Sequence, residues 1–497
     1  MRWFFALLVL LAPLAAIASD RSNMPPPEQR HFSSQGHDGF SPFPPPPVDD
    51  TLFIVDTDTD LDTGCAFRSD GPLVIRLQVT RYVGPVTADG TLVEDSRLKL
   101  IAGGFLSRNA HLRLPAYDVD IHGDPADPAV PPEVDRVMFN GREVGILTGD
   151  DEIWKLNEFV IPIEWVRFPS KGSDGTPPVP ADNIITIDID TEGGGEENWC
   201  TAVDWVELDF GAIAPIFLVH GIFSSGKDAW PNFAAVFADA GIPFSDEIDL
   251  SPIGSIEGNA ASLAGRLRSQ AAKFGAKRCH IIAHSKGGLD TRAYLNGEYD
   301  ADELRVLSLY TLSTPHHGTV LADIGVALQT GLAIASGTRR LIPQLFPFIS
   351  DLSTLSTAIF NFRYGSVPGG IRVYCYGADA DANGDGSLNA GEAAQLPSVL
   401  SSPAVATALY NIVGNESPVK VTFGTQTVRL WGDFSFRIID IDIVRDFRKN
   451  DVLVSTVSAE APFGAYAGTR LANHVAVKDS GLARTVLNQI LADYPSR

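Results

Sequence analysis

The segment of residues 280–295 constrains the fold more than any other part of the sequence. An apolar, strand-like run leads directly into Ser285-Lys286-Gly287-Gly288, and a stretch of helical character follows. A serine at such a junction sits on a strained turn, so the positions two before and two after it must not crowd the backbone. Ala283 and Gly287 meet that need. The pattern predicts a strand, a tight turn and a helix that present Ser285 as a nucleophile.

The two parts of the chain differ in periodicity. From 213 to 497, apolar strand-like runs alternate with helical stretches. Together with the serine turn, this alternation predicts an α/β-hydrolase domain, an α/β fold with a mostly parallel sheet flanked by helices. From 51 to 212, short runs such as 73–80 and 184–189 alternate between apolar and polar residues. That pattern predicts an antiparallel β-sandwich ahead of the α/β domain. Within it, the segments 134–145 and 199–205 resemble jelly-roll domains of the galactose-binding type, which implies a jelly-roll-like sandwich.

A second loop carries glycine next to a strand-like run. Residues 215–219 are apolar and end in His220-Gly221-Ile222. In folds with a serine on a strand–helix turn, this loop and the residue after the serine each donate a backbone N–H to the developing oxyanion. We therefore expect the backbone N–H groups of Ile222 and Lys286 to form the oxyanion hole. The Lys286 side chain is incidental to that role, and His220 is interpreted as a structural brace.

The base follows by elimination. The expected chain order is serine, acid, histidine. After Ser285 the sequence holds histidines at 316, 317 and 474. The pair at 316–317 comes too early for a base, which belongs near the end of the fold. His474 is therefore predicted to take the proton from Ser285.

The acid is expected before the histidine, in the loop after a late strand. Residues 438–444 have the pattern of that strand, and Asp451 lies in the loop beyond it. Asp451 is therefore predicted to orient the histidine and to stabilise its charged form. Asp446 is the alternative, while Asp440 and Asp442 are less suited because they lie within the strand.

Three motifs carry a resemblance to a known family. They are His220-Gly221-Ile222, Ala283-His284-Ser285-Lys286-Gly287-Gly288-Leu289 and Ser313-Thr314-Pro315-His316-His317-Gly318. This set resembles bacterial secreted triacylglycerol lipases, which carry H-G, G/A-H-S-x-G-G and G-T-P-H-x-G in the same order. The resemblance covers residues 213–325 well and 445–495 moderately. It implies hydrolysis of lipid esters, and the acid and base of that family fall where Asp451 and His474 stand.

Residues 381–392 fit the twelve-residue calcium loop of the EF-hand, including glycine at the sixth position and an apolar residue at the eighth. The predicted ligands are Asp381, Asn383, Asp385, Ser387 through its carbonyl, Asn389 and Glu392. We expect one structural calcium ion in a lone loop, with a flanking helix on its C-terminal side only, and no organic cofactor. The alternative is a solvated turn.

A long apolar insertion lies at residues 320–368. Apolar side chains recur at helical spacing at positions 348, 352, 355 and 359. The insertion is either a mobile lid over an acyl pocket or an ordinary core helix.

The beginning of the sequence has the features of an export signal. Arg2 precedes an apolar run, and Ala16-Ile17-Ala18 is a small-x-small cleavage site, so residues 1–18 are predicted to be a signal peptide. The proline-rich residues 19–50 are predicted to be a linker. No later segment is apolar enough to span a bilayer. The mature protein is therefore expected outside the cell or in the periplasm, and not as an integral membrane protein.

Cysteine usage and charge narrow the expectations further. Export permits disulfides, and Cys65 with Cys200 is the predicted pair, whereas Cys279 and Cys375 are predicted to be buried thiols. The formal net charge is −23, with acidic residues spread along the chain. Such a balance argues against nucleic acid as a partner and suits a neutral ester or lipid substrate.

Together these features predict a secreted carboxylic ester hydrolase, a lipase or esterase, that acts through Ser285, Asp451 and His474. A polyester depolymerase or an amidase is the alternative among enzymes, since a β-sandwich attached to a hydrolase suits an insoluble polymer. A catalytically inert matrix- or carbohydrate-binding protein is the alternative from another class.

Overall fold

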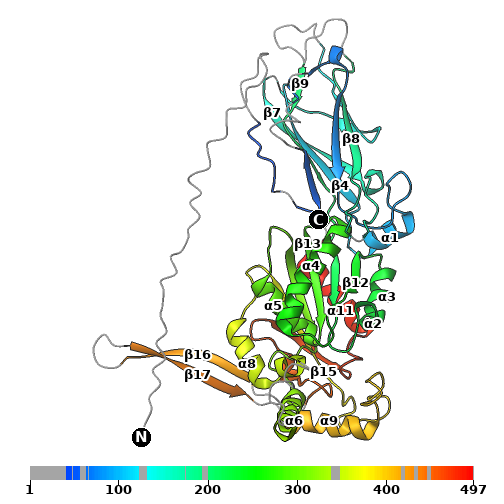
Figure 1. Cartoon of the computed structure of the whole chain (residues 1–497). Coiled ribbons are helices and arrows are strands. Elements are labelled where there is room, and N and C mark those ends of the chain that lie inside the picture. Colours follow the sequence, from blue (N-terminus) through cyan, green and yellow to red (C-terminus); the bar gives the residue numbers. More distant parts are fainter. Residues whose placement is uncertain are drawn as a thin grey trace. The chain divides into compact units, whose positions relative to one another are not determined.

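The structure is a computed structural model of the chain (Figure 1). It describes residues 41–47, 49–55, 63–64, 66–122, 131–150, 152–173, 175–192, 200–336, 347–415, 420–429, 435–444 and 449–495. The predicted signal peptide, most of the predicted linker, Cys65 and Asp446 lie outside these residues. Residues 41–497 belong to one compact unit. Within the described ranges, none of the helices combines the length and the apolar character that crossing a membrane requires.

Two antiparallel sheets come first in the chain. One has the order β1 (Leu52–Val55), β10 (Val206–Asp209), β4 (Asn109–Tyr117), β9 (Cys200–Val203) and β2 (Ala66–Phe67), and β7 (Trp154–Pro162) also pairs with β4. The other has the order β3 (Leu73–Val79), β8 (Ala181–Asp188), β5 (Arg136–Phe139) and β6 (Arg142–Ile146). Strand β3 shows why these segments are strands: Ile75 and Leu77 are buried while Arg76 between them is exposed.

The buried faces of the two antiparallel sheets share one hydrophobic core, so the predicted antiparallel structure ahead of the α/β domain is confirmed. Short helices interrupt it, namely α1 (Glu94–Ala102) and 3-10 turns at Arg68–Asp70 and Ile163–Trp165. The sequence did not indicate α1, because Leu100 is its one fully buried residue and no apolar stripe marks it.

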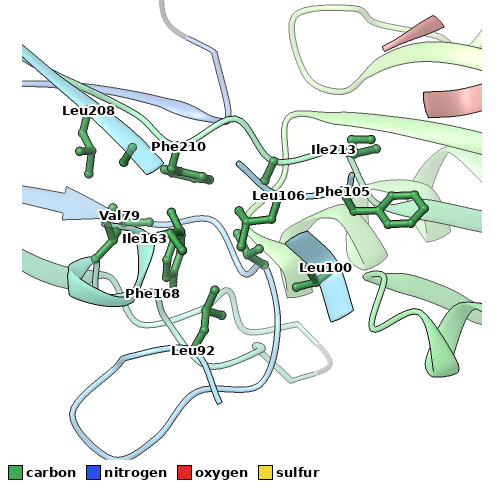
Figure 2. Packing of buried hydrophobic residues seen from close by; sticks show 14 of the residues in the cluster. Val79, Leu92, Leu100, Phe105, Leu106, Ile163, Phe168, Leu208, Phe210 and Ile213 are labelled. Atoms are coloured by element: carbon green, nitrogen blue, oxygen red, sulfur yellow. The ribbon is translucent and has the colours of Figure 1, made fainter. Parts of the chain in front are cut away.

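The same core continues into the α/β domain. Figure 2 shows Phe210 and Leu106 at the end of the antiparallel sheets, with Phe105 and Ile213 beyond them. Nearby, the fully buried Arg81 donates a hydrogen bond to the Ile213 carbonyl at 2.7 Å. A continuous core of this kind fixes the linking segment that enters the parallel sheet.

The α/β domain is built on a six-stranded parallel sheet. Its order is β12 (Phe244–Ile248), β11 (Ile216–Val219), β13 (Arg278–His284), β14 (Arg305–Leu312), β15 (Arg372–Asp379) and β18 (Ala465–Leu471). Every neighbouring pair is parallel. The helices are α2 (Gly226–Ala229), α3 (Pro231–Asp239), α4 (Ile256–Phe274), α5 (Lys286–Gly297), α6 (Val320–Ser336), α7 (Pro347–Asp351), α8 (Thr354–Arg363), α9 (Pro403–Asn415), α10 (Thr456–Ala459) and α11 (Ser480–Asp493).

Helices cover both faces of this sheet. Ile216 and Leu218 of β11 join the core cluster that holds side chains of α3 and α11. Phe217 and Val219 of the same strand join the cluster that holds side chains of α4 and α5. Since successive strand residues point to opposite faces, the sheet is buried on both sides. The predicted α/β-hydrolase-like class is therefore confirmed.

Two segments differ from the sequence-based prediction. The run at 438–444 is part of β17 (Ser435–Val444), but β17 pairs with β16 (Lys420–Arg429) in a separate antiparallel hairpin and not with the parallel sheet. The last strand of the sheet is instead β18, which the sequence did not indicate because most of its residues are exposed or half-buried.

Within the insertion at 320–368 the structure describes the helices α6, α7 and α8, with non-helical residues at 352–353 and 364–368. The predicted apolar stripe does not face one side. Leu352 is buried, whereas Leu355 and Ile359 are 72% and 62% exposed on α8.

Candidate active site

Ser285 occupies the turn between β13 and α5, as the strand–turn–helix pattern predicts. Its φ is 54° and its ψ is −134°, a backbone conformation that a non-glycine residue adopts only when the surroundings enforce it. The surroundings here are tightly packed. A Cβ at Gly221 would lie 2.6 Å from the Ser285 Cβ, and a Cβ at Gly287 would collide with the His220 carbonyl oxygen. The two glycines let the His220 loop and the serine turn approach each other.

Three side chains predicted from the sequence come together around Ser285. His474 Nε2 lies 2.9 Å from Ser285 Oγ, and His474 Nδ1 lies 2.8 Å from an Asp451 carboxylate oxygen. All three side chains are buried. The imidazole is therefore placed to take a proton from the hydroxyl through Nε2 while its Nδ1–H donates to the carboxylate.

The loop of Asp451 is held by backbone donors. The second carboxylate oxygen of Asp451 accepts the N–H of Leu453 at 3.0 Å and of Val454 at 2.7 Å. The His474 N–H donates to the Asp451 carbonyl at 2.9 Å, so backbone and side chain both join the two residues. Val452, between Asp451 and these two donors, has a φ of 84°, which is strained for a β-branched residue.

The acid loop does not follow a strand of the parallel sheet, so the reasoning that selected Asp451 needs correction. The strand before it in sequence, β17, lies in the hairpin. The loop is instead attached to the end of β15, where the Ala380 N–H donates to the Asn450 carbonyl at 2.8 Å. Tertiary contact with β15 therefore places the carboxylate beside His474.

Two further histidines brace the site. His284 Nε2 lies 2.8 Å from the His474 carbonyl oxygen, and its ring lies 4.7 Å from the His474 ring between centroids. Burial holds the pKa of His284 well below its usual range, so the neutral ring donates this bond. His220 accepts the Leu250 N–H at Nε2 and lies 2.7 Å from the Gly221 carbonyl through Nδ1. Both side chains hold backbone in place.

The predicted oxyanion donors flank the serine. Ile222 lines the same cavity as Ser285, and Lys286 is the first residue of α5. Within the described part of the chain, neither backbone N–H donates a hydrogen bond. A helix N-terminus directs positive charge toward the serine turn. These two N–H groups therefore remain available for a developing oxyanion.

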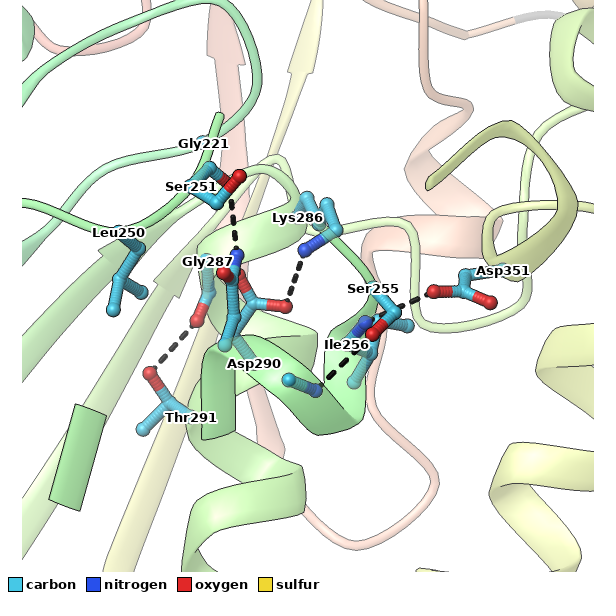
Figure 3. A network of polar contacts seen from close by, with 12 residues as sticks. Gly221, Leu250, Ser251, Ser255, Ile256, Lys286, Gly287, Asp290, Thr291 and Asp351 are labelled. Carbon is cyan, nitrogen blue, oxygen red and sulfur yellow. Dashed lines mark hydrogen bonds and ion pairs between the residues drawn. The ribbon is translucent and has the colours of Figure 1, made fainter. Parts of the chain in front are cut away.

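The Lys286 side chain, expected to be incidental, is part of a buried polar network (Figure 3). Its ammonium lies 2.6 Å from an Asp290 carboxylate oxygen, and both side chains are 2% exposed. The other Asp290 oxygen accepts the Asn259 amide at 2.8 Å, and Asn259 in turn donates to the Ser251 carbonyl at 3.0 Å. The network joins the first turn of α5 to α4 and so fixes Lys286, whose backbone N–H is a predicted oxyanion donor.

Sequence reasoning missed Asp290 and Asn259. The spacing of Lys286 and Asp290, four residues apart, fits an ion pair on one face of α5. No pattern in the sequence near these residues shows that this face of α5 is buried or that Asn259 of α4 hydrogen-bonds Asp290.

A cavity of about 690 Å³ opens beside Ser285 and His474. Its apolar lining consists of Ile222, Phe223, Ala229, Pro231, Pro397, Val399, Leu400, Leu453 and Val475. Residues of the 395–400 segment line the cavity, whereas none of the described residues of the 320–368 insertion does. No described residue of the insertion contacts this cavity, so the idea that the insertion forms a lid stays a prediction.

The acidic loop at 381–392 folds back on itself. Asp381 accepts backbone N–H groups of Gly384 and Gly386 at 2.8 Å, and Glu392 accepts those of Ala382 at 3.0 Å and Asn389 at 2.8 Å. Leu388 is buried in a small core cluster. The expected helix directly after the loop is absent from the described residues, where turns lead to α9 at Pro403.

The donors of this loop are all oxygen atoms, which suits calcium. Yet among the described residues no group of three acidic, histidine or cysteine side chains is arranged to hold a metal ion. The six predicted ligands, with Asp381 and Glu392 at the two ends of the loop, therefore remain a prediction.

The cysteines fall into two kinds. Cys200 is disulfide-bonded, while Cys279 and Cys375 are free and buried. Burial raises the pKa of both free thiols, which makes them unreactive. The predicted partner of Cys200, Cys65, lies outside the described residues.

The chain is similar to known lipases and esterases. Over 140 residues it is 32% identical to triacylglycerol lipase 2 of Saccharomyces cerevisiae, an alignment that covers 24% of this chain and 41% of that protein. The chain thus spans about two fifths of the length of this curated relative. No family model matches the chain.

Three solved structures resemble part of the chain. The mature form of a Bacillus licheniformis lipase is 21% identical with a TM-score of 0.38, over 56% of this chain and 92% of that one. Lipase 1 from Pelosinus fermentans is 17% identical with a TM-score of 0.37, over 55% and 98%. A metagenomic carboxyl esterase is 16% identical with a TM-score of 0.36, over 56% and 75%.

Proposed function

We propose that this chain is an exported carboxylic ester hydrolase, a lipase or esterase, with Ser285 as nucleophile, His474 as base and Asp451 as acid. The observation that carries the proposal is the chain of hydrogen bonds from Ser285 Oγ through His474 to Asp451. It is buried beside a cavity with a largely apolar lining. A hydroxyl in this arrangement becomes nucleophilic when the neighbouring imidazole takes its proton.

The reaction then follows from the positions of the groups. Ser285 Oγ attacks the ester carbonyl as His474 Nε2 takes the hydroxyl proton, and the Ile222 and Lys286 N–H groups receive the carbonyl oxygen as it gains charge. His474 returns the proton to the leaving alcohol, which leaves an acyl group on Ser285. A water molecule, deprotonated by His474, releases the acid and restores the hydroxyl. Asp451 stabilises the imidazolium in both steps.

The cavity supports an apolar acyl or alcohol group. Phe223 and Val399 line it and are also 69% and 76% exposed, so part of the cavity edge that faces solvent is apolar. Such an edge suits a water-insoluble ester. The similarity to triacylglycerol lipase 2 supports the same substrate class. The disulfide at Cys200 supports export, because disulfides persist in oxidising compartments.

The test is hydrolysis of p-nitrophenyl esters of graded acyl chain length by the protein and by Ser285→Ala, both with calcium present. We expect clear activity in the protein, its loss in Ser285→Ala, and a maximum at one chain length that separates lipase from short-chain esterase. Emulsified triglyceride, polyester film and anilides, assayed in parallel, separate the lipase from the depolymerase and amidase alternatives. Equal inertness of both proteins on every substrate would favour a binding protein and contradict the proposal.

A further inference from the structure

Lys478 places a cationic side chain in the wall of the candidate active-site cavity. It lies four residues after His474, just before α11, and lines the same cavity as Ser285. The whole residue is 9% exposed. The ammonium lies 5.6 Å from the centroid of the Trp230 ring, and the Asn232 amide donates to the Lys478 carbonyl at 3.1 Å. The backbone and the stem of this lysine are thus held in place.

Across the residues that the structure describes, no carboxylate pairs with this ammonium and no acceptor hydrogen-bonds it. The acidic neighbours are engaged elsewhere. Asp479 caps α11 through the Leu482 N–H at 2.6 Å and contacts Arg470 at 3.4 Å. Asp228, which also lines the cavity, accepts the Ser225 hydroxyl at 2.6 Å.

A buried charge without a counter-ion is costly, so proteins rarely keep one where it has no use. The contact with Trp230 offsets part of that cost. Lys286, by comparison, is even more buried near the same serine and has Asp290 as its partner. The Lys478 ammonium lacks a counter-ion and borders the cavity. A molecule bound in the cavity can therefore supply the negative charge.

We infer that Lys478 binds a negatively charged group, a carboxylate or a phosphate, on the ester that occupies the cavity. The inference rests on the proposed ester hydrolysis and narrows its substrate class. It departs from the neutral substrate that the net charge of −23 favours. Net charge acts at long range and is screened by salt, whereas one buried ammonium acts on the bound molecule directly.

The test compares matched ester pairs that differ by one anionic group. In the acyl part, p-nitrophenyl hexanoate is compared with the mono-p-nitrophenyl ester of adipic acid. In the alcohol part, phenyl acetate is compared with para-acetoxybenzoate, and dibutyrin with dibutyryl phosphatidic acid. The variants are Lys478→Met, which keeps the stem and removes the charge, and Lys478→Arg, which keeps the charge. Lys99→Met, at an exposed lysine on α1, is the control.

For at least one pair, Lys478→Met is expected to lower the anionic-to-neutral ratio of kcat/KM by about tenfold to a hundredfold, the usual effect of a hydrogen bond to a charged group. Lys478→Arg should restore the ratio in part, and Lys99→Met should leave it unchanged. The pair that responds identifies where the charge lies and whether it is a carboxylate or a phosphate. A ratio unaffected by Lys478→Met in every pair would overturn the inference.

Binding to Ser285→Ala separates this inference from the proposed function. Calorimetry would compare the monoanilide of adipic acid with hexananilide, in Ser285→Ala with and without Lys478→Met. Preferential binding of the anion that disappears with Lys478→Met supports the inference even if no ester is hydrolysed. Equal affinities in both backgrounds, for this pair and for the two alcohol-side ester pairs, which Ser285→Ala should leave intact, overturn it even if esters are hydrolysed.

The preference should also depend on pH. Burial lowers the pKa of Lys478 to about 8, so its positive charge is present below that pH and lost above it. The titratable groups around it are His220 and His284, whose pKa values are lowered, His474 and Asp228, which line the same cavity, and the adjacent Asp479. The anionic-to-neutral ratio should therefore fall as pH rises through about 8. It should stay constant over that range in Lys478→Arg, because a guanidinium remains charged.

Discussion

The buried pair of Lys286 and Asp290 permits a quantitative prediction about how the serine turn is held. The two charges are 2.6 Å apart and both side chains are 2% exposed. At an effective dielectric constant of about 20, their attraction is about 6 kcal/mol, most of which offsets the cost of removing both charges from water. Removing one partner leaves the other buried and unpaired. Removing both leaves neither charge to desolvate.

We therefore expect Asp290→Asn and Lys286→Met each to lower the free energy of unfolding by about 3–5 kcal/mol. The double variant Lys286→Met/Asp290→Leu should lose far less than the sum of these two values. Urea unfolding followed by circular dichroism gives the three free energies and, from the cycle, the coupling between the side chains.

The two single variants should differ in their pH dependence. Burial, partly opposed by Lys286, raises the pKa of Asp290 to about 6. Without the ammonium that pKa rises further above its unfolded value. An acid whose folded pKa is raised costs stability as pH rises through the range between the two values. The loss in Lys286→Met, relative to the unsubstituted protein, should therefore grow as pH rises from about 6 to 8, while the loss in Asp290→Asn should not grow. Single losses below about 1 kcal/mol, or additive losses, would refute the reasoning.

Three further predictions concern the turn, the acid and the acidic loop. Gly287→Ala should unfold the turn or abolish ester hydrolysis, because its Cβ would collide with backbone. Gly265→Ala, on an open face of α4, is the control and should be neutral or stabilise the protein by up to about 1 kcal/mol. Thermal melting of the two variants distinguishes these outcomes. Asp451→Asn should lower kcat about 10⁴-fold with the fold intact. The backbone N–H groups of Leu453 and Val454 would hold the amide oxygen of the new side chain. The amide NH₂ would then face His474 and force the imidazole into the wrong tautomer. A loss below about tenfold would contradict this role. If the acidic loop binds calcium with a Kd of about 0.1–1 mM, ten millimolar calcium should stabilise the protein by about 1–3 kcal/mol. Glu392→Gln should lose most of that gain. Identical melting of both proteins with calcium and with EDTA would contradict calcium binding at this loop.

Local patterns were sufficient to predict the parts of the site that are local. The serine turn needs a strand, small residues and a helix within a few positions, all of which are visible around Ser285. His474 followed from chain order and from the small number of histidines. The class of the fold followed from the alternation of strand-like and helical segments, which the parallel sheet bears out.

The remaining features depend on contacts that no local pattern shows. The strand-like run before Asp451 has the same pattern whether it joins the sheet or, as here, a hairpin. The polar network of Lys286 and Asp290 depends on Asn259, which lies far away in sequence. Lys478 looks like an ordinary surface lysine until the cavity around it is known.

The most direct test of the proposed nucleophile is covalent labelling by a fluorophosphonate, which reacts with serine hydroxyls only when a neighbouring base activates them. Intact mass and peptide mapping would compare the protein with Ser285→Ala and His474→Ala. We predict one adduct, on the peptide that contains Ser285, no adduct in Ser285→Ala and a strongly slowed reaction in His474→Ala. Labelling of the protein and Ser285→Ala to the same extent, or no labelling of the folded protein, would contradict the assignment of Ser285.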